Sequence, residues 1–269
     1  MSKSKDLKKI KIPNVENFTM EYYIANQADM QNAHVYPPHL HDELEIYILL
    51  EGDASFMVEK NLYKLSPGDA IISKPNEMHN CILNSNSIHK HLCFWFEITP
   101  VALFTPFLSA GNFISPTEED KKRLFYIYQE LDIANTRTQT NRQAYLALEM
   151  LDIFSRYLGV SSKPVVIPEK LYEILDDINK NFTEINTLDY FTEKYFISQS
   201  TLNRLFRQHL NTSPKTYLET KRLAYSRILL KEGKSVFDAC MLAGFPDYSN
   251  YIRLFKTRFG ITPKRYRDG

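Results

Sequence analysis

Cysteine is scarce in this sequence of 269 residues, which contains only Cys81, Cys93 and Cys240. Their number is odd, and they lie far apart along the chain. A disulfide framework needs paired cysteines, and a structural zinc site needs closely spaced ones. The sequence therefore lacks the pattern of a disulfide-rich or zinc-stabilised domain, and it suits a reducing cytoplasm.

Long hydrophobic runs are also missing, since no stretch of eighteen apolar residues occurs. The charged start, MSKSKDLKKIKIP, has no apolar segment of the kind found in a signal peptide. A glycine-rich phosphate loop and a nucleophile elbow are absent as well. We therefore expect a cytoplasmic protein without a membrane span and without these nucleotide-binding or hydrolase motifs.

Charge is distributed unevenly along the chain. Residues 196–269 contain 14 Lys and Arg against 5 Asp and Glu, a net charge of +9. Residues 1–195 contain 19 basic and 27 acidic residues, a net charge of −8. A basic segment joined to an acidic one indicates a polyanionic partner for the basic part alone.

An internal repeat lies within this basic segment. Residues 200–217, STLNRLFRQHLNTSPKTY, align without gaps with residues 249–266, SNYIRLFKTRFGITPKRY, and seven of the eighteen positions are identical. In the second copy the spacing of the apolar residues predicts one face of an α-helix. These residues are Tyr251, Leu254, Phe255 and Phe259. The repeat therefore indicates a duplicated structural unit.

Each copy is preceded by a second short helical pattern. A polar N-cap starts the next helix in both units, Ser198 in the first and Asp247 in the second. Gly244 suits the turn of the second unit, whereas the first has Tyr195 and Phe196 there. Two short helices joined in this way predict a helix-turn-helix, whose second helix can enter the DNA major groove.

A longer helical pattern, residues 215–232, connects the two units. Eighteen helical residues span roughly 27 Å. A connector of this length would place two reading helices near one turn of DNA apart, roughly 34 Å.

Residues 165–267 resemble the DNA-binding domain of the AraC/XylS family of transcription regulators. The motifs that carry this resemblance are Gly244-Phe245, Arg253-x-Phe255-Lys256, Phe259-Gly260, Thr262-Pro263 and Tyr266-Arg267. The chain departs from the family pattern at Ala239-Cys240, where Ile-Ala is usual, and at Asn211, where the first unit usually has Gly.

The resemblance implies that the second helix of each unit contacts DNA. The base-reading candidates are Gln199, Ser200, Asn203 and Arg204 in the first unit, and Tyr248, Ser249, Asn250 and Arg253 in the second. The phosphate-contact candidates are Arg207, Lys215, Lys256, Arg258 and Lys264. The chemistry agrees, because Arg pairs bidentately with guanine, Asn pairs with adenine, and phosphate contacts position the protein without reading sequence.

Short alternating apolar stretches fill residues 18–98, which predicts a β-barrel or sandwich. Within them, His39-x-His41, Glu45 and Gly52 resemble the first cupin motif, and Pro75 with His79 resembles a looser second one. The resemblance covers roughly residues 15–100 and implies the cupin-like sensing domain of many AraC-type regulators.

Residues two apart on a strand share a face. We therefore expect a binding site inside the barrel, with effector-binding candidates His39, His41, Glu45, Tyr47, His79 and Trp95. Three histidines and a carboxylate are also the metal set of cupin enzymes, so a metal site of His39, His41, Glu45 and His79 is an alternative. A structural role is a third. The preferred hypothesis is an effector pocket without metal or cofactor.

Two helical stretches follow the barrel, at 117–134 and 142–158. Thr117 and Asp120 form a capping-box-like start, and Ala144, Leu148, Leu151 and Phe154 or Ser155 form a stripe. Such helices could cover the barrel or form a dimer seam, and the resemblance favours dimerisation.

The sequence thus predicts an all-β cupin-like domain with helices, followed by an all-α domain with two helix-turn-helix units. The expected divisions are an N-terminal arm 1–17, an effector domain 18–160, a linker 161–168 and a DNA-binding domain 169–269. We expect a homodimeric, non-enzymatic DNA-binding regulator with a small polar effector, such as a sugar or carbohydrate derivative, and RNA polymerase as a further partner. The alternatives are a metal-dependent cupin enzyme with a basic accessory domain, and a constitutive DNA binder whose barrel only dimerises.

Overall fold

The chain folds into two compact units, whose main division in the sequence lies between Val165 and Val166; of the described residues, 38–40 are grouped with the C-terminal unit. This point lies inside the predicted linker 161–168. The computed structural model describes residues 8–11, 19–25, 38–84, 89–96, 104–159 and 164–269. Among these residues, no helix is both long and apolar enough to traverse a bilayer.

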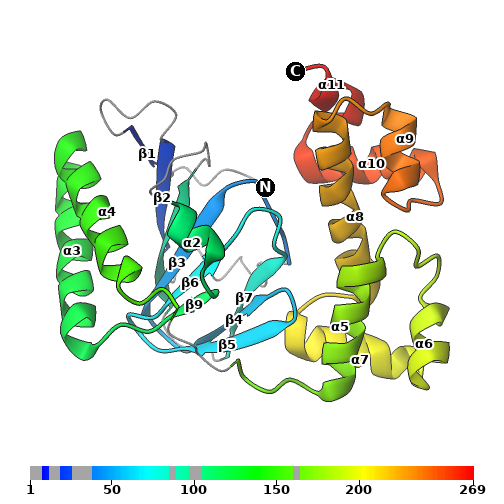
Figure 1. The fold of residues 1–269 in the computed structure, drawn as a ribbon, viewed down its shortest axis with the longest axis horizontal. Helices are drawn as coiled ribbons and strands as arrows, with labels where there is room; N and C mark the ends of the chain where they lie inside the picture. Colours follow the sequence, from blue (N-terminus) through cyan, green and yellow to red (C-terminus); the bar gives the residue numbers. More distant parts are fainter. Residues whose placement is uncertain (1–7, 12–18, 26–37, 85–88, 97–103, 160–163) are drawn as a thin grey trace. The chain divides into compact units, whose positions relative to one another are not determined.

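The N-terminal unit contains two antiparallel sheets (Figure 1). The larger sheet has the order β1 (Lys8–Lys11), β2 (Thr19–Ala25), β8 (Lys90–Phe96), β3 (Leu44–Glu51), β6 (Ala70–Ser73) and β9 (Phe113–Ile114). The smaller sheet has the order β5 (Asn61–Leu65), β4 (Ala54–Val58) and β7 (His79–Leu83). The predicted all-β, cupin-like class of this unit is confirmed.

Strand β1 corrects part of the predicted N-terminal arm. Lys8–Lys11 pairs antiparallel with residues 19–22 of β2, in the register Lys8 to Tyr22 and Lys11 to Thr19. Backbone hydrogen bonding therefore makes this segment the edge of the sheet. The rest of the predicted arm, 1–7 and 12–17, lies outside the described residues.

Strand β3 is buried along both of its faces. Leu44, Ile46 and Ile48 belong to one apolar cluster, whereas Tyr47 and Leu49 belong to another. The second cluster includes residues of β4, β5 and β7, so the two sheets pack face to face around it. Strand alternation thus gives β3 one face toward the second sheet and one face away from it.

Helices cover the other face of the larger sheet. Helix α2 (Thr105–Ser109) comes first, and α3 (Glu118–Thr136) and α4 (Thr140–Ser155) form an antiparallel pair beside the strands (Figure 1). Leu131 and Met150 lie in the same cluster as Ile46 and Phe94. The alternative that these helices cover the barrel is therefore correct for their buried faces.

Two details of the predicted helices can be compared with the structure. The Thr117 side chain accepts a hydrogen bond from the Asp120 amide, which confirms the predicted cap. In α4, Ala144, Leu151 and Phe154 are buried, but Leu148 is exposed. The predicted stripe was wrong at Leu148 because the buried face of α4 lies on the side of Leu146, Ala147 and Met150.

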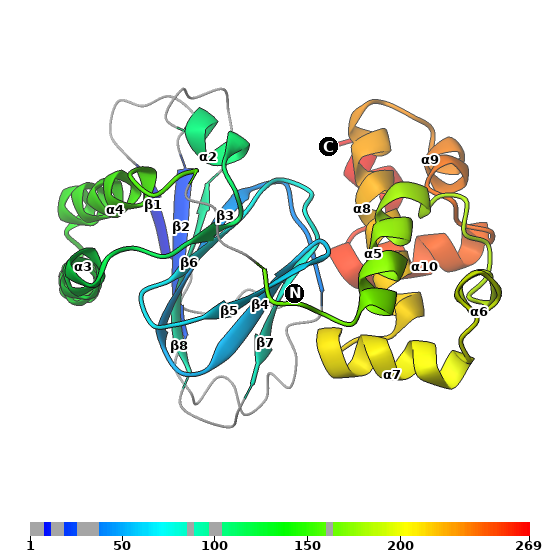
Figure 2. The same ribbon diagram turned by 60° about the horizontal axis from the view of Figure 1, so that its bottom comes forward.

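The C-terminal unit is all α-helical, as predicted (Figure 2). Its helices are α5 (Glu169–Asn181), α6 (Asp189–Tyr195), α7 (Gln199–Leu210), α8 (Pro214–Lys231), α9 (Val236–Leu242), α10 (Tyr248–Phe259) and α11 (Pro263–Arg267). Helices α6 and α7 form the first helix-turn-helix, and α9 and α10 form the second. Helix α8 joins them, close to the predicted range 215–232.

The turns of the two helix-turn-helix units both contain a residue with a positive φ, but the residue differs. Ser198 and Asp247 cap α7 and α10 as predicted. Gly244 takes the left-handed conformation in the second turn, with φ +83°. The first turn places Phe196 in that conformation, with φ +51° and a ring that is 94% exposed. This backbone conformation normally favours glycine, and the exposed ring of Phe196 gains no burial from adopting it.

Two contacts join the helix-turn-helix units through the segment between α5 and α6. A side chain on Gly244 would collide with the backbone of Thr183. The buried guanidinium of Arg222 on α8 donates hydrogen bonds to the carbonyl oxygens of Phe182, at 2.8 Å, and Ile185. The same short segment therefore contacts both α8 and the turn of the second unit.

The contact at Gly244 yields a stability prediction. We expect Gly244→Ala to destabilise the C-terminal unit by about 2–4 kcal/mol, because the methyl group meets backbone and the residue keeps a positive φ. Gly260→Ala is the matched control, since Gly260 has φ +78° and open space around it. Its expected cost is only about 1–2 kcal/mol.

Urea unfolding followed by far-UV circular dichroism measures both variants. The single tryptophan, Trp95, reports on the N-terminal unit and should be unaffected. Equal destabilisation by the two substitutions would contradict the close contact with Thr183.

Candidate functional site

Helix α7 separates its side chains into a buried face and an outer face. Leu202, Leu205, Phe206 and Leu210 are buried. Gln199, Ser200 and Arg204 are exposed, and Asn203 is half-buried. The 3.6-residue helical period thus places all four base-reading candidates of the first unit on the outer face.

Helix α10 repeats this arrangement. Tyr251 and Phe255 are buried in the core of the second unit. Tyr248, Ser249 and Arg253 are exposed, and Asn250 is half-buried. The repeat in the sequence therefore corresponds to two helices with similar polar outer faces.

Local hydrogen bonds orient several of these polar side chains. The Arg253 guanidinium donates to Asn250 Oδ1 at 2.6 Å, and Arg204 donates to Gln208 Oε1 at 3.3 Å. Both acceptors are neutral amides, so neither contact neutralises the arginine charge. Gln199 instead donates to the carboxylate of Asp189 at 3.0 Å. The two arginines are thus held on the outer faces with their charge intact.

The phosphate-contact candidates differ in exposure. Arg207, Lys215, Lys256 and Lys264 are exposed. Arg258 is half-buried, and burial and the nearby charge of Arg227 lower its pKa. The structure therefore exposes four of the five predicted cations to solvent and Arg258 only in part.

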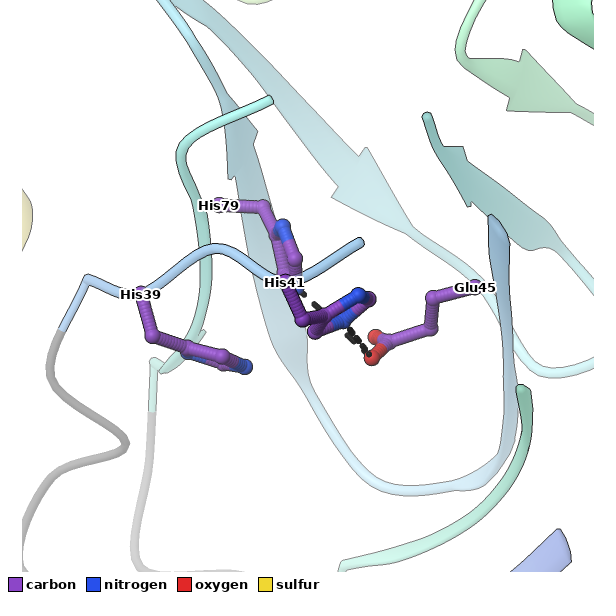
Figure 3. A group of neighbouring side chains, drawn as sticks. All are labelled: His39, His41, Glu45 and His79. Atoms are coloured by element: carbon purple, nitrogen blue, oxygen red, sulfur yellow. Dashed lines mark hydrogen bonds and ion pairs between the residues drawn. The ribbon is translucent and has the colours of Figure 1, made fainter. Parts of the chain in front are cut away.

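A polar cluster lies at one end of strand β3 (Figure 3). His39, His41, Glu45 and His79 each have one potential ligand atom within 4.8 Å of the others. Glu45 Oε2 lies 3.0 Å from His41 Nε2 and 3.6 Å from His79 Nε2. The same oxygen accepts a hydrogen bond from Trp95 Nε1 at 2.6 Å. Three of the other five effector candidates, His41, His79 and Trp95, thus converge on the Glu45 carboxylate.

Burial and charge act in opposite directions on this cluster. Burial disfavours the charged forms of both Glu45 and His41. The neighbouring histidines nevertheless hold the pKa of Glu45 well below its usual range, and contacts with Glu45 and Glu43 raise the pKa of His41. The cluster therefore favours an ionised Glu45 carboxylate beside a protonated His41.

Tyr47, the sixth candidate, belongs to a second polar group inside the sandwich. Its hydroxyl lies 2.9 Å from His89 Nε2 and 3.5 Å from Cys81 Sγ. His89 Nε2 in turn lies 3.1 Å from His91 Nδ1. Burial and the neighbouring His89 lower the pKa of His91 to about 3, and burial also lowers the pKa of His89.

His89 and His91 were not among the predicted site residues. A usable signal was present, because His91 and Cys93 alternate with Trp95 along β8 and so share its face. The sequence did not reveal which face of this strand points inward. The hydrogen bond from Trp95 to Glu45 now identifies that face.

Two family models match the chain, one in each unit. The model described as an AraC-like ligand binding domain matches residues 21–100. The model described as a helix-turn-helix domain matches residues 191–269. The matches therefore cover the strand-rich part with the polar cluster and the part with the duplicated helices.

Curated proteins match over most of their length. The HTH-type transcriptional activator RhaS of Enterobacter sp. is 24% identical over 258 residues, covering 87% of this chain and 88% of that protein. The uncharacterized HTH-type transcriptional regulator YbfI of Bacillus subtilis is 25% identical and covers 80% and 81%. The crystal structure of ToxT from Vibrio cholerae is 12% identical, covers 94% and 98%, and has a TM-score of 0.38.

The low pKa of His91 gives a pH prediction. Well above pH 6.5, His91 is neutral in both the folded and the unfolded chain, so it costs the folded state no stability. As the pH falls from 6.5 toward 3, His91 is protonated in the unfolded chain but stays neutral in the folded chain, so the folded state loses stability. Between pH 7.5 and 5.5 we expect His91 to cost the N-terminal unit about 1.4 kcal/mol.

Urea unfolding monitored by Trp95 fluorescence at the two pH values measures this loss. His91→Gln should lose less stability than the wild type, because glutamine does not titrate. His209→Gln, in the C-terminal unit, is the control and should behave as the wild type. The same loss in His91→Gln would show that other groups control the pH dependence.

Proposed function

Because this chain belongs to the AraC/XylS family of transcription regulators, we propose that a small polar molecule inside the N-terminal unit controls how the C-terminal unit reads DNA. The observation that carries the proposal is the duplication in α7 and α10. Each helix has a buried apolar face and an outer face with an arginine and short polar side chains. Such faces fit the major groove.

Direct reading of bases follows from the chemistry of the outer faces. Arg204 and Arg253 can each pair with O6 and N7 of guanine, and Asn203 and Asn250 with N6 and N7 of adenine. Arg207, Lys215, Lys256 and Lys264 would bind phosphates and give the complex a strong salt dependence. The half-buried Arg258 is a weaker candidate for the same role.

The proposed effector is polar because two groups of polar side chains lie among the apolar residues between the sheets. The first group lies at one end of the sandwich and consists of Glu45, His41 and Trp95. The second group consists of Tyr47, His89 and His91. Carboxylate and imidazole groups suit hydroxyl ligands, and the indole offers a flat apolar face. A sugar or carbohydrate derivative has both kinds of surface. The ToxT protein has been crystallised with an unsaturated fatty acid bound.

We propose a regulatory role without catalysis, as an activator located in the cytoplasm. The curated relative from Enterobacter sp. is named a transcriptional activator. RNA polymerase would then be a partner. The main alternative is a metal-dependent cupin enzyme with a basic accessory domain, which would require turnover of a small substrate.

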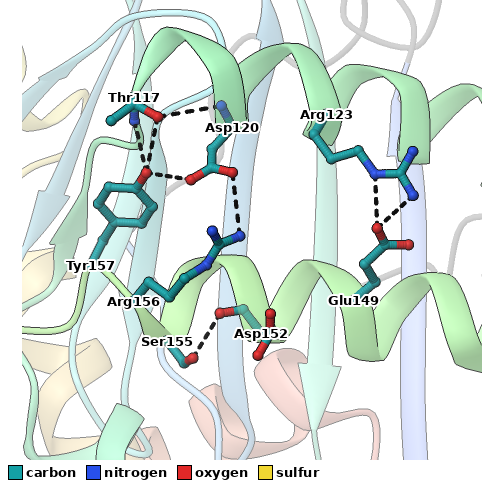
Figure 4. A network of polar contacts seen from close by, with 8 residues as sticks. All are labelled: Thr117, Asp120, Arg123, Glu149, Asp152, Ser155, Arg156 and Tyr157. Carbon is teal, nitrogen blue, oxygen red and sulfur yellow. Dashed lines mark hydrogen bonds and ion pairs between the residues drawn. The ribbon is translucent and has the colours of Figure 1, made fainter.

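The outer surface of α3 and α4 is the proposed dimer interface. Arg123 donates to Glu149, and Asp120 accepts from Arg156 and Tyr157, so polar contacts hold the helices together (Figure 4). Large apolar groups remain exposed on the same pair. They are Tyr126, Ile133, Tyr145 and Leu148. A second copy of the chain would remove these groups from water.

Control requires that the effector bind one arrangement of the two units better than another. A ligand with equal affinity for both arrangements shifts nothing. Preferential binding would change how α7 and α10 are presented to DNA, and hence transcription.

Replacement of Arg253 tests direct base reading. Arg253→Ala should weaken binding to the preferred DNA by about 1–3 kcal/mol and relax the preference at one base pair. Lys256→Ala is the matched control on the same helix. It should weaken binding on every sequence and reduce the salt slope by about one.

Footprinting locates the bound sequence near the chain's own gene, and fluorescence anisotropy at several salt concentrations then measures both variants. If Arg253→Ala weakened binding equally on every DNA sequence, Arg253 would be a phosphate contact and not a base-reading residue. The absence of any binding at low salt would overturn the regulatory function.

Ligand screening tests the effector proposal. A sugar present at 100 times its Kd should stabilise the N-terminal unit by about 2.7 kcal/mol, measured as a rise in the Tm seen by Trp95 fluorescence. Tyr47→Phe should reduce the rise, because it removes one hydroxyl facing the interior. No shift with any polar ligand would favour the constitutive DNA binder.

A further inference from the structure

The second helix of each helix-turn-helix unit begins with a residue that contacts the preceding helix. Gln199, the first residue of α7, donates a hydrogen bond at 3.0 Å to the carboxylate of Asp189, the first residue of α6. Tyr248, the first residue of α10, instead lies against the ring of Phe237, the second residue of α9, with ring centroids 5.9 Å apart. The same position is therefore held by a polar contact in the first unit and by an aromatic pair in the second.

The aromatic pair lies on the surface of the second unit. Phe237 is 58% exposed and Tyr248 is 43% exposed. The ring of Tyr248 also lies 6.5 Å from the ring of Tyr251, which belongs to the buried core of this unit. The ring of Tyr248 is thus positioned by one ring on each helix, while the outer surface of the pair stays open to a ligand.

The position of the pair favours DNA as that ligand. In a helix-turn-helix the N-terminal residues of the second helix contact base edges, and the first helix crosses the DNA backbone. Tyr248 begins α10, and the exposed Ser249 and Arg253 continue the same helix. The aromatic pair is therefore continuous with the proposed DNA surface, and the inference drawn from it rests on that proposed function.

The chemistry of the pair indicates which feature of DNA it would contact. In the major groove thymine presents a 5-methyl group, which apolar side chains recognise and which the other three bases lack. We propose that Phe237 and Tyr248 together bind the 5-methyl group of one thymine in the half-site read by α10. Phe237 is then a specificity-determining residue, although it lies outside the reading helix.

The same comparison separates the two half-sites. At the start of α7, Gln199 presents an amide, which pairs with hydrogen-bonding groups on a base edge and not with a methyl group. The half-sites read by α7 and α10 should therefore differ at the base pair that faces these two residues.

Replacement of thymine by deoxyuridine tests the contact directly, because it removes only the 5-methyl group. Each thymine of the sequence located by footprinting is replaced in turn, and the affinity of the full-length protein is measured by fluorescence anisotropy. We expect one replacement to weaken wild-type binding about fourfold, the equivalent of one buried methyl group. The same replacement should weaken binding much less in Phe237→Ala and in Tyr248→Ala, because these variants have already lost the contact.

Two further variants serve as controls. Tyr248→Phe removes the hydroxyl and keeps the ring, so it should remain sensitive to the methyl group. Met241→Ala is the matched control on α9, since Met241 is 53% exposed and lies one helical turn beyond Phe237. It should bind both forms of the DNA as the wild type does. All the replaced side chains are exposed, and circular dichroism verifies that the variants are folded.

The thymine contact would be overturned if no deoxyuridine weakened wild-type binding, or if folded Phe237→Ala and Tyr248→Ala kept the full sensitivity. Loss of the sensitivity in Tyr248→Phe or in Met241→Ala would also contradict it. In each of these cases the protein would still bind its DNA, and the regulatory function would stand. A wild-type protein that bound no DNA at all would instead overturn the regulatory function, and the thymine contact with it.

Discussion

The N-terminal unit depends on one constraint, which is that β3 and β8 are buried on both faces. Leu44, Ile46 and Ile48 pack under the helices, while Glu45 and Tyr47, one residue away, face the second sheet. A shift of the register by one residue would exchange these sets and place a carboxylate under the helices. The packing of the apolar face thus fixes the position of the polar cluster.

The C-terminal unit depends on buried polar groups as much as on its apolar core. Arg222 contributes to the high positive charge of this part of the sequence, yet it is buried and bound to two carbonyl oxygens. Asp177 is also buried and accepts hydrogen bonds from Lys194, Tyr190 and Tyr195. Their charge stabilises the scaffold, and the cations on α7 and α10 remain for DNA.

Most of the fold could be predicted because the two periodicities are strong. The apolar period of α10 and the alternation of β3 appear directly in the sequence, and the capping residues Ser198 and Asp247 mark helix starts. The sequence also placed Glu45 and Tyr47 on one face. Neither the conformation of Phe196 nor the outward direction of Leu148 was predictable, because both depend on what the rest of the chain packs against.

The polar cluster was only partly predictable for the same reason. Its members come from three separated segments, and spacing alone does not show that their atoms converge. The partner of Trp95 required the register between β3 and β8, in which Glu45 pairs with Trp95. His89 precedes its strand, so alternation could not place it.

The close approach of Gly244 to Thr183, together with the hydrogen bonds from Arg222 to Phe182 and Ile185, links the two helix-turn-helix units through one short segment. Units that are linked in this way would not follow two half-sites of DNA freely if the spacing of the half-sites changed. One inserted base pair rotates the second half-site by about 35° around the duplex, since a turn contains 10–10.5 base pairs. An operator read by both proposed helices would therefore be constrained in length as well as in sequence.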